Sequence, residues 1–291
     1  MDESAVVALE ALLGVPRAAW QQITFLDLRY KGITEVPNSI CLLGNLTMLC
    51  LDGNPLTSLP DSIGQLHNLV TLSLNNNRLA SLPDSLGQLR NLRALCLGCN
   101  QLTSLPGSIG LLGNLADLYL ENNQLTSLTD LIGQLHNLET LSLTSNQLTF
   151  LPDLFNQLVK LKYLYLGDNQ LTLLPDSFCR LGSLVKLDLC FNQLTLLPDR
   201  FGQLNNLVTL DLGDNQLTLL PDSFTQLGNL GALDLNGNPL TSLPDSLGQL
   251  GKLERFSIDC RNMHSAHPAT IKFLARHKAS TAHIQPRMSD G

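Results

Sequence analysis

The chain has 291 residues, 44% of them hydrophobic but only 5% aromatic, and its formal net charge is −7. This acidic balance gives the chain as a whole no electrostatic basis for binding nucleic acid. No run of about 18 apolar residues is present, so we predict no stable membrane insertion.

The first residues lack the features of a secretory signal, because Met1–Ser4 has no basic stretch and the following apolar run is short. Residues 2–22 instead predict a short helix capped by Ser4 and ended by Gly14. Trp20 falls where later units place a buried leucine. We therefore predict that residues 1–22 form an N-terminal cap.

From Ile23 onward one pattern, L-x-x-L-x-L-x-x-N-x-L, recurs every 23 residues without insertion, up to a last copy at Leu253. Self-similarity at this period is the signature of leucine-rich repeats. The L-x-x-L-x-L part predicts a short strand with inward leucines, and stacked units predict a parallel sheet over residues 23–262.

Asparagines occupy one position after each predicted strand, where they would be buried. Because an amide both donates and accepts, each can satisfy backbone groups of its own turn and of the adjacent one. We predict a structural role for the nine residues of this column: Asn54, Asn77, Asn100, Asn123, Asn146, Asn169, Asn192, Asn215 and Asn238.

The return half of each unit reads L-P-D-S-I/L/F-G-Q-L, where proline begins a short helix or 3-10 turn and aspartate favours its first turn. We interpret these aspartates as part of the repeat pattern. Four consecutive units place phenylalanine at one position, predicting a stacked ladder of Phe155, Phe178, Phe201 and Phe224.

The pattern decays at the eleventh unit, where Arg261 replaces the asparagine. A helix is predicted from His267 to about Lys278, opened by Pro268, and residues after about Ser280 are expected to form a mobile basic tail. We predict that residues 263–291 comprise a C-terminal cap and this tail.

Over Ile23 to about Arg261 the chain resembles the typical intracellular leucine-rich repeat family, which includes Ras-signalling scaffolds and bacterial and protist proteins. The resemblance implies an α/β solenoid, a horseshoe of about 11 repeats with a concave parallel β-sheet and convex short helices or 3-10 turns. It also implies protein binding through the concave face, but does not identify the partner.

The sequence contains seven cysteines. Their positions do not indicate the paired clusters at both ends that close extracellular repeat domains, since none precedes Cys41 and only Cys260 follows Cys190. Free thiols indicate a reducing compartment, so we predict a cytoplasmic protein. Secretion by a signal-less bacterial system is left open.

The solvent-facing position at the centre of each predicted strand carries aspartate in three successive units: Asp188, Asp211 and Asp234. Neighbours about 5 Å apart repel by about 1 kcal/mol even in water. Serine and cysteine fill this position elsewhere, so we infer that the acids serve a function. A merely solvated acidic face is the alternative.

Neighbouring positions add aromatic and charged groups of the kind found in binding hot spots. We predict that repeats 5–10 bind a basic protein surface, as a signalling scaffold or adaptor. The alternative is a bacterial effector or a recognition subunit with a separate catalytic partner. The predicted contact residues are Tyr119, Tyr163, Tyr165, Asp168, Lys186, Asp188, Phe191, Asp211, Asp214 and Asp234, with Arg255 on the same face.

The sequence does not indicate a metal site, a catalytic site or a cofactor site. A regular row of aspartates rarely converges enough oxygens on a cation, and the pair Cys96 and Cys99 lacks the second pair that a zinc site needs. No Ser/His/Asp or Cys/His grouping, phosphate loop or dinucleotide motif is found. We therefore predict a protein that is not an enzyme and has no cofactor and no metal.

Overall fold

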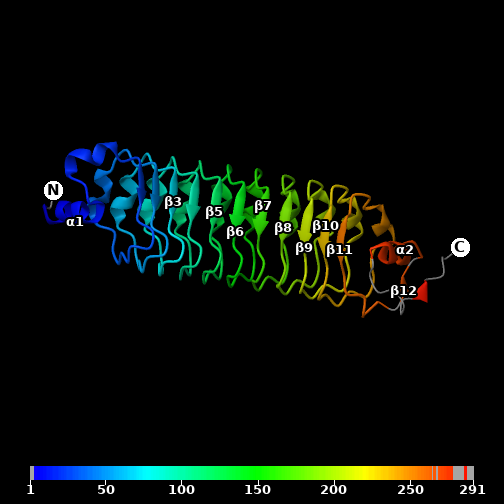
Figure 1. Ribbon diagram of the computed structural model, residues 1–291. Helices are drawn as coiled ribbons and strands as arrows, with labels where there is room; N and C mark the ends of the chain where they lie inside the picture. Colours follow the sequence, from blue (N-terminus) through cyan, green and yellow to red (C-terminus); the bar gives the residue numbers. More distant parts are fainter. Residues whose placement is uncertain (1–2, 264, 267, 278–284, 287–291) are drawn as a thin grey trace. The chain divides into compact units, whose positions relative to one another are not determined.

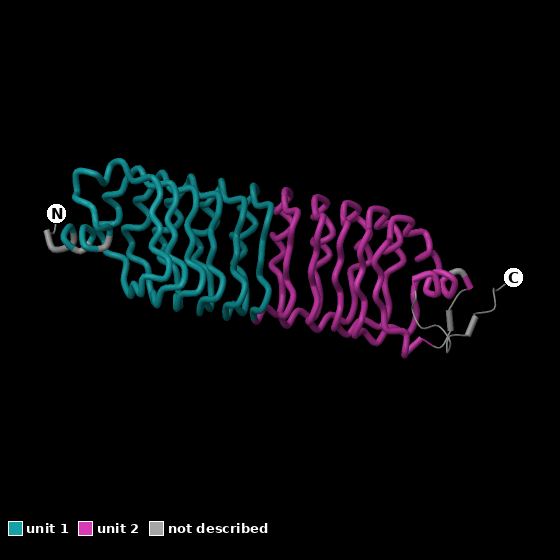
Figure 2. Tube along the Cα trace, viewed as in Figure 1, with its two compact units in different colours: residues 1–146 teal, residues 147–291 magenta. Residues whose placement is uncertain are grey.

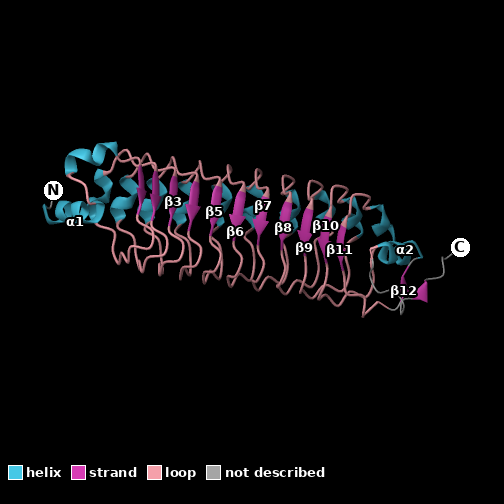
Figure 3. Ribbon diagram, in the orientation of Figure 1, coloured by secondary structure: helices cyan, strands magenta, loops and turns pink. Residues whose placement is uncertain are grey.

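A computed structural model describes residues 3–263, 265–266, 268–277 and 285–286. The chain divides into two compact units, residues 1–146 and 147–291 (Figure 2). In each unit the strands form one layer and the 3-10 turns form another, joined by loops (Figures 1 and 3). None of the helices in these ranges has the length and apolar character needed to cross a membrane.

The strands of the repeats are three residues long and run parallel to one another, in the order of the sequence within each unit. Unit 1 contains β1 (Phe25–Asp27), β2 (Met48–Cys50), β3 (Thr71–Ser73), β4 (Ala94–Cys96), β5 (Asp117–Tyr119) and β6 (Thr140–Ser142). Unit 2 contains β7 (Tyr163–Tyr165), β8 (Lys186–Asp188), β9 (Thr209–Asp211), β10 (Ala232–Asp234) and β11 (Arg255–Ser257). The predicted leucine-rich repeat solenoid is confirmed.

The return halves form 3-10 turns rather than α-helices. They are η2 (Asn38–Leu42), η3 (Asp61–Gln65), η4 (Asp84–Gln88), η5 (Gly107–Leu111), η6 (Asp130–Gln134), η7 (Asp153–Gln157), η8 (Asp176–Arg180), η9 (Phe201–Gln203), η10 (Asp222–Gln226) and η11 (Asp245–Gln249). Proline precedes most of them in an extended conformation. Before η6, where proline is missing, the Thr129 hydroxyl accepts a hydrogen bond from the Leu131 amide instead.

The asparagine column is structural, as predicted. The Asn146 side chain is 8% exposed, and its amide donates to the carbonyls of Leu120 and Leu143, both at 3.0 Å. Its Oδ1 atom accepts from the Leu125 N–H at 3.0 Å. Each such asparagine therefore satisfies backbone groups of its own repeat and of the one before.

The predicted phenylalanine ladder consists of two stacked pairs. Ring centres are 6.4 Å apart for Phe155 and Phe178, and 6.0 Å apart for Phe201 and Phe224. All four rings are fully buried. The boundary between the two pairs coincides with η9, the shortest of the 3-10 turns in the described residues, which begins only at Phe201.

At the N-terminal end, α1 (Glu3–Leu13) and η1 (Arg17–Gln22) precede the first strand. The helix begins before Ser4, so Ser4 lies inside it, whereas Gly14 ends it with a positive φ of 66°. Trp20 is 2% exposed. The capping role of residues 1–22 remains a prediction.

At the C-terminal end, α2 (Pro268–Arg276) packs against η11 and buries Phe273 and Leu274. The predicted ends of this helix, His267 and Lys278, lie outside the described residues. Within the predicted mobile basic tail, Gln285–Pro286 form β13 and pair in parallel with β12 (Ser265–Ala266). The rest of the predicted tail lies outside the described residues.

Candidate protein-binding surface on the strands

The predicted contact residues divide between the units. Tyr119 lies on β5 of unit 1, and the other nine lie in unit 2. The candidate surface is therefore built from the strand face of unit 2, which we define by Tyr163, Tyr165, Asp168, Lys186, Asp188, Phe191, Asp211, Asp214, Asp234 and Arg255.

The strand register aligns the central positions of this surface in one row. Tyr165 pairs with Asp188, Asp188 with Asp211, and Asp211 with Asp234. Adjacent strands lie about 4.8 Å apart, so the three aspartates are direct neighbours. All three side chains are half-buried.

Each aspartate of the row also has a local structural role, which the sequence reasoning missed. The Oδ1 atoms of Asp188, Asp211 and Asp234 accept a hydrogen bond from the N–H two residues later, at 3.1, 2.9 and 2.8 Å. An aspartate at this position thus has a structural reason. The bond requires an oxygen rather than a negative charge, however, and asparagine would supply one.

The charge of the row is not compensated by an ion pair with any cation that the structure describes. Within the described ranges, no lysine or arginine forms an ion pair with Asp188, Asp211 or Asp234. Burial raises the pKa of Asp211, and the charges of the neighbouring aspartates raise it further. The row therefore presents carboxylates that a cationic partner would stabilise.

The residues at the turn-side edge share a left-handed backbone. Asp168, Phe191 and Asp214 have φ values of 54°, 51° and 51°. Aspartate tolerates this conformation, which gives Asp168 and Asp214 a conformational explanation. A bulky phenylalanine does not favour it, and Phe191 is 58% exposed. Phe191 is thus an exposed aromatic held at a backbone cost.

A shallow hollow of about 230 Å³ lies on the strand face at β9–β11. Asp211 and Asp234 line it together with the small side chains of Thr209 and Ala232, and Arg255 lies at its far side. A side chain of a partner could enter this hollow beside two carboxylates.

Metal binding gains little support from the geometry. Asp188, Cys190 and Asp211 each offer one ligand atom, all within 4.8 Å of one another. Burial and the adjacent Asp188 raise the pKa of the Cys190 thiol. Two carboxylate oxygens and one thiol sulfur form a mixed set of hard and soft ligands, and such acidic groups are common without an ion.

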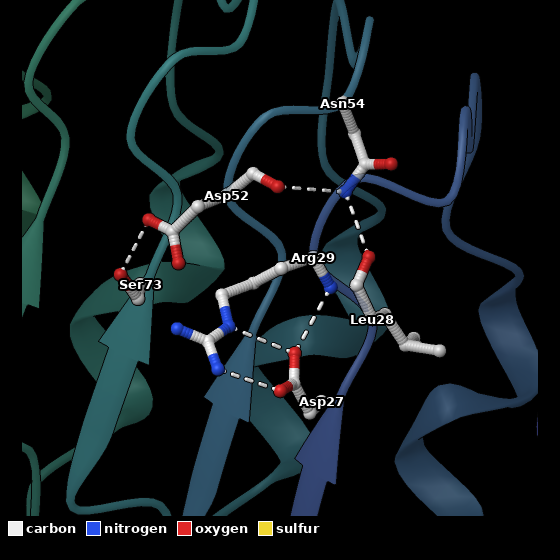
Figure 4. A network of polar contacts seen from close by, with 6 residues as sticks. All are labelled: Asp27, Leu28, Arg29, Asp52, Asn54 and Ser73. Carbon is white, nitrogen blue, oxygen red and sulfur yellow. Dashed lines mark hydrogen bonds and ion pairs between the residues drawn. The ribbon is translucent and has the colours of Figure 1, made fainter.

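The strand face of unit 1 differs at Asp27 of β1, which lies at the same repeat position as the acidic row and is paired with a cation (Figure 4). Asp27 forms two hydrogen bonds with the Arg29 guanidinium, at 2.9 and 2.7 Å, which lower the pKa of Asp27. Asp52 accepts a hydrogen bond from the Ser73 hydroxyl at 2.6 Å. The uncompensated acidic row of unit 2 is thus not a general property of these repeats.

Comparison with known families supports the repeat assignment. A family model described as "Leucine rich repeat" matches residues 44–102, 67–125, 90–148, 113–171, 136–194 and 182–240. Together these matches span more than half of the chain. Among curated proteins, none matches the chain significantly.

Similar solved structures come from bacteria and plants. A leucine-rich repeat protein of Leptospira interrogans is 32% identical over 93% of this chain and 86% of that chain, with a TM-score of 0.62. The functional domain of InlJ from Listeria monocytogenes is 26% identical over 85% of this chain and 56% of that chain, with a TM-score of 0.71.

A plant peptide hormone receptor, RGFR1 in complex with RGF2, is 26% identical over 87% of this chain, with a TM-score of 0.59. The chain covers 49% of that receptor chain, and so about half of both the Listeria and the plant structures.

Proposed function

Because this chain belongs to the leucine-rich repeat family, we propose that it is a non-enzymatic scaffold or adaptor that binds a protein partner through the strand face of unit 2. The similar plant receptor, solved with a bound peptide hormone, supports a protein ligand for repeats of this kind. The partner we propose carries a basic surface.

The row of Asp188, Asp211 and Asp234 carries this proposal. Three half-buried carboxylates in direct register repel one another, and no cation in the described residues compensates them. Their backbone hydrogen bonds would be kept by asparagine, so the negative charge needs another reason. Contact with lysine or arginine side chains of a partner supplies that reason and steers its approach.

Aromatic side chains beside the row are the proposed anchors. Tyr163 is 39% exposed and Phe191 is 58% exposed, while Tyr165 is half-buried. Aromatic side chains dominate the binding energy of many protein interfaces. Phe191 is the most exposed of the three, and its backbone conformation disfavours a bulky residue, which supports a role for its ring in binding.

We also propose that the protein works in a reducing compartment such as the cytoplasm. All seven cysteines are free thiols, and burial raises the pKa of Cys96 and Cys179 to about 11. These features suit thiols that remain reduced.

The proposal is tested by neutralising the row while its hydrogen bonds are kept. A triple variant, Asp188→Asn, Asp211→Asn and Asp234→Asn, retains an oxygen acceptor at each position. Immobilised wild-type and variant chains are exposed to the same cell lysate, and captured proteins are quantified by mass spectrometry. We expect basic proteins captured by the wild type to be lost with the variant.

The matched control removes an equal number of negative charges from the 3-10 turns of unit 1, through Asp61→Asn, Asp84→Asn and Asp130→Asn. This control should retain the wild-type partners. Equal capture by the wild type and the strand variant would contradict the proposal, as would equal loss with the control.

A further inference from the structure

A row of exposed apolar side chains runs along four successive repeats of unit 2, away from the strands. Its members lie in the loop between strand and 3-10 turn, at one repeat position, and we call them the apolar stripe. They are Phe150, Leu173, Leu196 and Leu219, with exposed fractions of 52%, 53%, 53% and 52%.

The repeat itself does not require apolar residues at this position. Five other repeats carry serine there: Ser58, Ser81, Ser104, Ser127 and Ser242. The buried leucine that follows, such as Leu174, provides the core contact instead. The stripe therefore places roughly a few hundred Å² of apolar surface in water without a packing reason, the size at which such patches are often functional.

Backbone hydrogen bonds set the spacing of the stripe. The N–H groups of Gln170, Gln193 and Gln216 each donate to a leucine carbonyl of the preceding repeat at 2.9 Å, those of Leu148, Leu171 and Leu194. These bonds lie two or three residues before the stripe position and join all four repeats of the stripe. Neighbouring repeats therefore approach each other here at about the 4.8 Å spacing of paired strands.

This spacing favours a helical occupant over an extended one. An α-helix presents one row of side chains per turn of about 5.4 Å. An extended peptide repeats on one face only every ~6.6 Å, twice its rise per residue. A helix lying along the stripe thus advances about one turn per repeat, and its i, i+3/i+4 and i+7 side chains can fit between the stripe residues.

Acidic residues flank the stripe on its 3-10 side. Each stripe residue is followed three positions later by an exposed aspartate, within about 10 Å along an extended chain. These residues are Asp153, Asp176, Asp199 and Asp222. They would attract a partner with basic residues beside its apolar face, and repel both an anionic lipid surface and the identical stripe of a second copy.

We propose that the apolar stripe is a second docking surface, which binds an amphipathic α-helix of a partner protein with lysine or arginine along one side of its apolar face. This surface is separate from the strand face and does not depend on the proposed function of that face. A chain with two such surfaces can hold two partners at once.

Selection from two displayed libraries tests the proposal with the full chain as bait. One library randomises the exposed face of a stable monomeric helix, and the other displays random extended peptides. The expected winners are helices with apolar residues at i, i+3 or i+4 and i+7, flanked by lysine or arginine. The proposal would be overturned if extended peptides were selected in place of helices, or if the selected helices carried acidic residues beside their apolar face.

A quadruple variant then shows where the selected helix binds. Phe150→Ser, Leu173→Ser, Leu196→Ser and Leu219→Ser introduce the residue that other repeats already carry, so the fold should persist, as checked by circular dichroism. We expect the selected helix to bind this variant at least about tenfold more weakly, measured by fluorescence anisotropy. Unchanged affinity would refute the assignment.

Two matched controls separate the stripe from general hydrophobicity and from the strand face. The double variant Val159→Ser and Val208→Ser removes side chains that are 57% and 44% exposed elsewhere in unit 2. The triple asparagine variant of the strand face provides the second control. Both should bind the helix like the wild type, and comparable weakening in either would contradict the proposal.

Two other occupants of the apolar stripe, a second copy of the chain and a lipid surface, would give different experimental results. Sedimentation equilibrium of the wild type alone should show a monomer; stripe-dependent self-association would mean that a second copy covers the stripe. Vesicles containing phosphatidylglycerol should not bind. Binding to them that is lost in the quadruple variant would replace the helix with a lipid surface.

Discussion

The ammonium group of Lys186 lies 4.9 Å from the centre of the Tyr165 ring on the neighbouring strand. This cation–π contact directs the positive charge of Lys186 toward an aromatic ring. Lys186 forms no ion pair with a carboxylate in the described residues, so the acidic row next to it stays uncompensated. The contact also joins the aromatic and acidic parts of the candidate surface.

Replacing Phe191 should separate stability from binding. Phe191→Asn puts a residue that tolerates positive φ at a backbone angle of 51°, and should stabilise the fold by about 1 kcal/mol. Urea denaturation measures this gain, while partner capture should fall. Asp168→Asn, at the same position of the preceding repeat, should leave stability nearly unchanged. Loss of stability in Phe191→Asn would show that the ring packs on the fold.

Neutralising Asp211 should stabilise the protein at neutral pH. Because burial and neighbouring charges raise the folded-state pKa of Asp211 above its unfolded value, the ionised group opposes folding at neutral pH. Asp211→Asn should therefore add ~1 kcal/mol at pH 7. The gain should disappear as pH falls below about 4, where the carboxyl is protonated in both states.

Thermal melts of wild type and Asp211→Asn at pH 7 and pH 3 measure this difference. Asp214→Asn, a change of equal charge at the exposed edge, is the control and should have a smaller effect. A gain that persisted at pH 3 would exclude an electrostatic origin.

Loss of one buried amide should be costly. Asn146→Ala leaves the buried Leu125 N–H without its acceptor and removes one donor each from the carbonyls of Leu120 and Leu143. The variant should therefore destabilise the fold by about 1–3 kcal/mol. Asn114→Ala is the control: its amide donates to the Arg90 carbonyl, but the residue is exposed and water can replace the bond. Equal losses in both variants would contradict this account.

The 3-10 turns of unit 1 should be sensitive to one added methyl group. A Cβ at Gly87 would lie 2.6 Å from the Ser108 carbonyl oxygen of the next repeat, so Gly87→Ala should cost about 1–3 kcal/mol. Gly113→Ala meets no atom within 4 Å and should be neutral. Hydrogen exchange of the amides in η4 and η5 would locate the damage; unchanged exchange would mean that the turns move apart freely.

The fold could be predicted from the sequence because the repeats are regularly spaced. Because the interval of 23 residues never varies, one reading of Leu161, Leu164 and Leu166 as inward strand residues applied to every copy, and the structure buries all three. The buried amide of Asn146 could likewise be deduced, since a polar group at a core position must find partners.

Features that depend on backbone conformation could not be deduced in the same way. One example is the left-handed conformation of Phe191, and another is the hydrogen bond that the Cys190 N–H donates to Asp188. Both follow from the path of the chain after each strand. The sequence did hold one overlooked signal, the change from serine at Ser127 to phenylalanine at Phe150. Only the exposed fraction shows that such a residue faces water.

The asparagine column also governs which length changes the protein can accept. Asn238 accepts from the Leu217 N–H and donates to the Leu212 carbonyl, both in the preceding repeat. If residues 193–215 were deleted, Asn215 would be lost together with the Leu194 N–H from which it accepts. The Leu189 carbonyl, to which Asn215 donates, would then accept from Asn238 in its place. Whole units can thus be lost or duplicated while every buried amide keeps equivalent partners. A deletion of another length would instead leave the asparagine that follows the junction out of register with the repeat before it.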